Sequence, residues 1–171
     1  KSLYVLGKSD IKSTKDLVGK TVAIPDGIGG SDHNIAMRFF NHDKIDPRTV
    51  KFKPVEAGVA VLAMQNGELQ GAVLGDQFAK KFLDDGTLRI VRSLTFDDDF
   101  KKEACCIHAV GADFYEANPI TVKKLTRAHE AASKWMTENP EEAVKILQEN
   151  KWASGDPKLV LEIFKTYNFM I

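Results

Sequence analysis

The sequence predicts an α/β fold, in which a mostly parallel sheet is flanked by helices and followed by a separate helical segment. Over the first two thirds of the 171 residues, short β-branched runs alternate with helical patterns of apolar residues, as in domains built on a parallel sheet. From residue 113 onward the pattern is helical to the end. The chain is 43% apolar, which provides for a hydrophobic core and excludes extended disorder.

The elements of the first part follow from the spacing of apolar residues. Short apolar or alternating runs predict strands at residues 3–6, 21–24, 50–55, 71–75 and 88–91. Apolar residues at helical intervals predict helices at residues 31–41, at 57–66 and from 76 onward. The first helix is expected to begin at Ser31, a favoured N-cap residue, and the second to end at Gly67. The residues between 24 and 31 include three glycines and are expected to form a loop.

The last part of the chain predicts one more strand and then three amphipathic helices. The strand is expected at residues 104–110, and Pro140 and Pro157 mark the starts of the second and third helices. Amphipathic helices need a surface to cover, and the strands of the first part are already matched with helices of their own. We therefore expect part of the surface that these helices cover to be missing from this chain. Their apolar faces would contact a second copy, as in a homodimer, or stay exposed.

These patterns divide the chain into four parts. The expected parts are an entry segment at 1–19, a complete α/β lobe at 20–94, a connecting strand segment at 95–112, and a helical segment at 113–171. The lobe at 20–94 is the only part with enough alternating strands and helices to form a layered core by itself.

Charge and hydropathy exclude two classes of protein. Lys and Arg number 24, and Asp and Glu also number 24, so the formal net charge is zero. Binding to nucleic acid requires a basic excess that this sequence lacks, so no nucleic-acid partner is expected. No apolar run reaches the length of about 18 residues that a helix needs to span a bilayer.

The loop before Ser31 is the first candidate for ligand binding. A loop that follows a strand and begins a helix directs backbone N–H groups and the positive helix end at one point, which suits an oxygen-rich anion. The candidates are therefore Gly29, Gly30 and Ser31, with His33 in the first helical turn. Asp26 in the same loop opposes an anion. From spacing alone, a tight turn with a helix cap and an exposed histidine is the simpler explanation.

Asp76 is the second candidate, because it directly follows the strand at 71–75, where open α/β sheets place their ligand contacts. A carboxylate at this position accepts hydrogen bonds from an amine, an amidine or a pyrimidine ring. An N-cap of the following helix explains the aspartate as well, and the two roles are compatible. Gln77 beside it is a further candidate.

The sequence predicts neither a metal centre nor a catalytic group. The four histidines show no metal-ligand spacing with a second ligand. Cys106 and His108 share one face of the predicted strand, but nucleophilic chemistry needs a third group that orients the base, and none is identifiable. Cys105 and Cys106 are adjacent and give no disulfide framework. We therefore expect no cofactor and no enzymatic activity.

Several segments in combination resemble a known family. They are residues 11–25 (IKSTKDLVGKTVAIP), 30–33 (GSDH) and 63–73 (AMQNGELQGAV), followed by Asp76. In this combination the chain resembles the solute-binding proteins of ABC importers, within the nitrate/sulfonate/taurine and thiamine-precursor-like branch. The helical tail, with residues 111–114 and 139–143, is similar to the closing helices of that family.

The resemblance implies a type II periplasmic binding fold of two α/β lobes, whose cleft closes on a small polar ligand by a hinge motion. It also implies that residues 1–19 and 95–112 are the crossover or hinge segments, and that residues 113–171 are the C-terminal helices of the other, incomplete lobe. It implies an extracytoplasmic protein, periplasmic or anchored outside the cell membrane, with an ABC permease as its partner. The ligand-binding residues expected in the cleft are Gly29, Gly30, Ser31, His33, Asp76 and Gln77. The opening strands of the family's first lobe have no counterpart in this sequence.

Two other functions remain open at this stage. A ligand-sensing domain of a signalling protein would bind the same class of ligand without transport. The pyrimidine-precursor synthases of thiamine metabolism resemble receptors of this fold and have a cysteine-rich, iron-linked motif. Only Cys105 and Cys106 are available here for such a motif.

Overall fold

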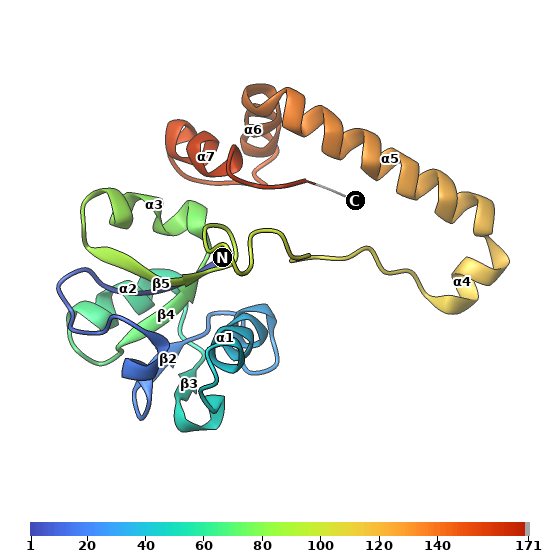
Figure 1. Ribbon diagram of the computed structural model, residues 1–171. Helices are drawn as coiled ribbons and strands as arrows, with labels where there is room; N and C mark the ends of the chain where they lie inside the picture. Colours follow the sequence, from blue (N-terminus) through green and yellow to red (C-terminus); the bar gives the residue numbers. More distant parts are fainter. Residues whose placement is uncertain (170–171) are drawn as a thin grey trace. The chain divides into compact units, whose positions relative to one another are not determined.

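The structure, a computed structural model, describes residues 1–169, and the chain forms two units (Figure 1). The first unit is Lys1–Lys102 and combines a five-stranded sheet with helices. The second begins at Glu103, and its described residues form helices and connecting segments. The α/β fold followed by a helical segment, predicted from the alternation of apolar patterns, is confirmed.

The sheet has the strand order β3-β2-β4-β1-β5. Its strands are β1 (Ser2–Leu6), β2 (Thr21–Ala23), β3 (Lys51–Lys53), β4 (Gly71–Leu74) and β5 (Leu88–Ser93). β2 pairs in parallel with β3 and β4, whereas β1 pairs antiparallel with β4 and β5. Four strands therefore run in one direction and β1 runs against them, so the sheet is mostly parallel, as predicted.

Helices and short turns cover both faces of this sheet. Each face presents apolar side chains, because successive side chains along a strand point to opposite faces. The covering elements are α1 (Ser31–His42), α2 (Ala57–Gln65), α3 (Asp76–Asp84) and the short 3-10 turns η1 (Thr14–Leu17) and η2 (Pro47–Thr49). Leu3 of β1 belongs to a buried cluster with Phe39 and Phe40 of α1. Tyr4, the next residue, belongs to a second cluster with Met64 of α2. The first unit is therefore a three-layer arrangement with a core on each side of the sheet.

The second unit has four helices in its described residues. They are α4 (Ala112–Ala117), α5 (Pro119–Glu138), α6 (Pro140–Glu149) and α7 (Pro157–Phe164). Pro140 and Pro157 begin α6 and α7, as predicted, because proline lacks only an N–H that the first turn does not use. The buried cluster of this unit consists of small and apolar side chains of α6 and α7, among them Val144 and Phe164.

Four details differ from the sequence predictions. The described residues of the second unit form four helices where three were predicted, because residues before Pro119 form the short helix α4. Residues 104–110 form no strand, because a strand requires hydrogen bonds to a partner strand and, among residues 1–169, no strand pairs with this segment. The N-cap of α1 is Gly30, and Ser31 is the first helical residue. The segment 1–19 contributes β1 to the sheet, so the first unit begins before residue 20.

Large apolar side chains are exposed along the second unit. Ile120 and Leu125 of α5 are 71% and 44% exposed, and Trp152 after α6 is 72% exposed. In the single chain these side chains are exposed, and the homodimer stays a prediction. No helix within residues 1–169 has both the length and the hydropathy needed to cross a membrane.

Candidate functional site

The predicted site residues meet at one end of the sheet of the first unit. β2 and β4 are parallel neighbours, so the segments that follow them, which begin α1 and α3, leave from the same edge. β1 runs the other way, and its first residue, Ser2, therefore pairs with Leu74 and Ser93 at this edge. We call this region the carboxyl edge. It consists of residues 1–2, 25–33, 75–77 and 93–95.

The loop between β2 and α1 is a tight turn that depends on glycine. The N–H of Gly27 donates to the Ile24 carbonyl at 2.8 Å, and the N–H of Gly30 donates to the Gly27 carbonyl at 3.1 Å. Gly27 and Gly29 adopt positive φ angles of 81° and 80°, which other residues rarely adopt. A Cβ on Gly30 would lie 2.4 Å from the carbonyl oxygen of Asp26. The backbone therefore approaches itself too closely for any side chain there.

His33 holds this loop from the first turn of α1. Its Nδ1 accepts a hydrogen bond from the Gly29 N–H at 3.0 Å, and its ring packs edge-on against Phe52, with centroids 5.0 Å apart. The amide of Asn34 donates to the Gly29 carbonyl at 3.2 Å. Both backbone groups of Gly29 are therefore used inside the loop. The exposed hydroxyl of Ser31 and the first N–H groups of α1, which have no partner within the helix, remain for a ligand.

Lys1 places a positive charge beside this helix end. Its Nζ donates to Asp26 Oδ2 at 2.9 Å and to Asp32 Oδ1 at 2.5 Å. Burial lowers the pKa of the Lys1 ammonium, but hydrogen bonds to Asp32 and Asp26 outweigh it and leave the pKa raised. The other oxygen of Asp32 accepts the Asp26 N–H at 3.1 Å. Two carboxylates thus neutralise one ammonium, and the attraction for an anion comes from neutral donors and the helix end.

Asp76 is fully buried and accepts four hydrogen bonds. Ser2 Oγ and Tyr4 OH donate to its Oδ1 at 2.7 and 2.6 Å. The main-chain nitrogen of Lys1 and the hydroxyl of Thr95 donate to its Oδ2 at 2.9 and 2.6 Å. Burial raises the pKa of this carboxyl, but the charge on the main-chain amino group of Lys1 and the hydrogen bonds from Thr95 and Tyr4 outweigh it, so the pKa is lowered. Asp76 therefore stays ionised while joining β1, α3 and the end of β5.

This role of Asp76 differs from a helix cap. The N-cap of α3 is Gly75, and the Asp76 side chain makes no capping hydrogen bond. Sequence reasoning missed its partners Ser2, Tyr4 and Thr95. One signal was present, because Ser2 and Tyr4 lie two residues apart and so share a face of the strand. Gln77, next to Asp76, is partly exposed.

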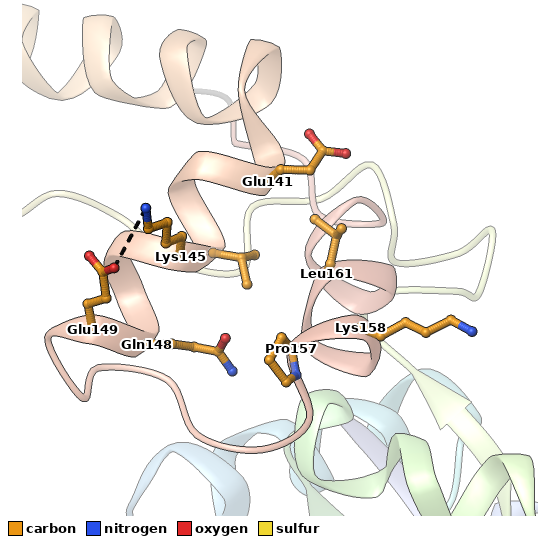
Figure 2. Close-up of a pocket in the computed structure, with 8 residues that line it drawn as sticks. Glu141, Lys145, Gln148, Glu149, Pro157, Lys158 and Leu161 are labelled. Carbon is orange, nitrogen blue, oxygen red and sulfur yellow. Dashed lines mark ion pairs between the residues drawn. The ribbon is translucent and has the colours of Figure 1, made fainter.

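A shallow groove lies in the second unit, between α6 and α7, and contains none of the predicted site residues (Figure 2). Its volume is about 430 Å³, and it is lined by Glu141, Val144, Lys145, Gln148, Glu149, Pro157, Lys158 and Leu161. The rim is charged, with Lys145 and Glu149 3.8 Å apart in an ion pair. It offers no converging set of donors comparable to the carboxyl edge.

A sequence model of the NMT1-like family matches residues 3–148, which is most of the chain. The chain belongs to the NMT1-like family. No curated protein matches it significantly.

Solved structures confirm the fold of this NMT1-like chain. The periplasmic aliphatic sulphonate-binding protein SsuA from Escherichia coli superposes with a TM-score of 0.78 at 17% identity, covering 97% of this chain and 54% of that one. The alkanesulfonate-binding protein SsuA from Xanthomonas axonopodis pv. citri, bound to MOPS, gives 0.69 at 17% identity, with coverages of 97% and 55%. A putative sulfonate-binding SsuA from Methylobacillus flagellatus KT gives 0.68 at 21% identity, with coverages of 98% and 49%. The chain thus spans about half the length of these proteins.

Proposed function

We propose that this NMT1-like chain is the ligand-binding part of an extracytoplasmic solute-binding protein of an ABC importer. The observation that supports the proposal most directly is the carboxyl edge. There α1 and α3 begin after β2 and β4, which are neighbouring strands of the sheet. Open α/β sheets bind ligands at this edge. The three similar structures are named as sulfonate-binding proteins, and two of those names call them periplasmic.

The ligand class follows from the donors that remain for a ligand at this edge. Ser31 contributes a hydroxyl, the first turn of α1 contributes backbone N–H groups, and Gln77 contributes an amide. Such donors suit the oxygens of a sulfonate or a similar oxyanion on a small organic molecule. Gly29, Gly30 and His33 shape the loop, and Asp76 positions the strand beneath it. In this proposal their contribution to binding is to hold Ser31 in place.

The proposal includes closure around the ligand. The chain provides one complete α/β unit, and the segment 95–112 connects it to the helices that follow. A ligand bound at the carboxyl edge would favour the closed arrangement of two lobes only through contacts that the open arrangement lacks. The closed form would then be the one that an ABC permease recognises.

Thermal unfolding of the chain with a panel of small molecules tests the ligand class. Ethanesulfonate, taurine and nitrate represent oxyanions, and an aminopyrimidine represents a donor-rich ring. We expect one of the oxyanions to raise the melting temperature in a concentration-dependent way, as a ligand that binds only the folded state must. Ser31→Ala should reduce the shift, whereas Ser154→Ala, in an exposed loop of the second unit, should leave it unchanged. Stabilisation by the pyrimidine alone would contradict the oxyanion assignment.

A further inference from the structure

Two histidines that are 21 residues apart in the sequence are in contact in the second unit. His108 lies in the exposed segment before α4, and His129 lies on α5. Their Nδ1 atoms are 2.8 Å apart, and their ring centroids are 3.9 Å apart at an interplanar angle of 81°. Neither a helical nor a strand spacing relates the two residues, so the sequence alone gave no sign of the pair.

The distance between the two nitrogens restricts their protonation. Two Nδ1 atoms at 2.8 Å share at most one proton, because an N–H on both would direct two hydrogens at each other. When both imidazoles instead take the tautomer with the proton on Nε2, each Nδ1 has a lone pair that can bind a cation once the rings turn toward it. That arrangement is a two-nitrogen site for a cation.

Imidazole nitrogen is a ligand that zinc, copper and nickel prefer. Zinc–nitrogen bonds are about 2.0–2.1 Å long, so two of them at a tetrahedral angle separate the nitrogens by about 3.3 Å. The two nitrogens would therefore move apart by about 0.5 Å. The rings, whose centroids are 3.9 Å apart, would also rotate so that both lone pairs point at the ion. Residues 104–110 are exposed and form no strand, so this movement breaks no ladder of backbone hydrogen bonds.

We propose that His108 and His129 bind one divalent transition-metal ion, with zinc as the representative, through their Nδ1 atoms. Among residues 1–169, no third His, Cys, Asp or Glu lies close enough to form a three-residue cluster, so water completes the coordination. The bound ion joins the segment that contains His108 to α5. Both ligands of this site belong to the second unit, so it shares no residue with the carboxyl edge, and it does not depend on the proposed transport role.

Two thiols near His108 offer a competing explanation for any metal binding. Cys105 and Cys106 are exposed, with sulfur atoms 3.8 Å apart, and thiolates are also strong zinc ligands. An experiment must therefore separate imidazole from thiol binding. Substituting the two pairs independently achieves this separation.

Calorimetric titration of zinc into the reduced chain is the first test. We expect one binding site, with an affinity that falls at least about tenfold in His108→Ala and in His129→Ala, since each removes one of two protein ligands. The double variant Cys105→Ser, Cys106→Ser should retain binding, and His42→Ala, which removes an exposed histidine of the first unit, should match the unchanged chain. Absence of binding, or its loss in the cysteine or His42 variants alone, would overturn the proposal.

Nitrogen-resolved NMR of the histidine side chains tests the geometry without any substitution. Zinc should shift the Nδ1 signals of two histidines together and leave a proton on each Nε2. Coordination through Nε2, or a response from a single histidine, would show that the pair does not form the site. Because this measurement uses the unchanged chain, it stays informative even where a histidine variant folds poorly.

Discussion

The carboxylate of Asp76 receives hydrogen bonds from β1 and from the residue two positions after β5, while its own backbone begins α3. Ser2 Oγ also lies 2.7 Å from Ser93 Oγ, which links β1 directly to the end of β5. A buried carboxylate is stable only when such donors replace the water that it loses. The position of β1 at the carboxyl edge therefore depends on Asp76 remaining charged and fully bonded.

Replacement of Asp76 tests this dependence. Asp76→Asn keeps the size of the side chain but removes its charge and one acceptor oxygen, leaving buried donors without a partner. We expect a loss of about 3 kcal/mol in the free energy of unfolding, the scale of removing one member of a buried charged network. Urea denaturation measures it. Asp98→Asn, at a side chain 88% exposed, should change stability by less than about 0.5 kcal/mol, and an equal loss in both variants would contradict the argument.

The same carboxylate makes the stability depend on pH in a definite direction. The pKa of Asp76 is lower in the folded chain than its ordinary value, so the unfolded chain binds more protons between the two values. Its stabilising contribution is complete above about pH 5 and declines as the pH falls through about 4 and below. The stability difference between the unchanged chain and Asp76→Asn should therefore shrink on acidification. Urea midpoints at pH 7, 5 and 3.5 measure it, and a constant difference would refute the assignment.

At the scale of elements, the loop from β2 to α1 sets the position of Ser31. Gly30 has ordinary φ and ψ angles of −73° and −179°, so its requirement for glycine comes from the close approach of Asp26 and not from backbone conformation. Gly75, the N-cap of α3, also has a negative φ, and a Cβ built on it meets nothing within 4 Å. The two glycines are therefore suited to a comparison, because a Cβ would be crowded at Gly30 and would have free space at Gly75.

Alanine at these two positions should have opposite consequences. Gly30→Ala forces the Asp26 carbonyl to move and is expected to destabilise the first unit by about 2 kcal/mol. Gly75→Ala is expected to be neutral or slightly stabilising, because it reduces the conformational freedom of the unfolded chain without strain. Urea unfolding compares them, and ligand-induced stabilisation should also be weaker in Gly30→Ala. Equal stability of the two variants would mean that the loop relaxes freely.

Elements that depend on local patterns were predictable, and contacts distant in sequence were not. The apolar spacing of α1 and the prolines of α6 and α7 are local signals, and each predicted its helix. The alternation at residues 104–110 is a local signal as well, but a strand also needs a partner strand, which the sequence of the segment does not specify. The glycines of the loop before α1 were also predictable from a local signal. The partners of Asp76 were not, because they lie 72 to 75 residues earlier and 19 residues later in the chain.

At the scale of the whole chain, the two units differ in how completely their apolar surface is buried. The first unit contains all pairs of the sheet and two buried clusters, one on each face. Among its described residues, the second unit has one cluster with four buried members, and side chains such as Ile120 and Trp152 remain exposed. The solved structures that share this fold are about twice as long as this chain.

Separate expression of residues 1–102 and 103–171 should reveal this difference. The first fragment keeps every strand pair and both clusters, so it should unfold cooperatively with a free energy of about 5 kcal/mol, as expected for a domain of this size. The second fragment has a small core for its length and should melt gradually, since short chains with few buried apolar residues are marginal. Circular dichroism during heating distinguishes a sharp transition from a broad one. A sharp transition for residues 103–171 would show that its helices are self-sufficient, and an unfolded 1–102 fragment would show that the sheet needs the rest of the chain.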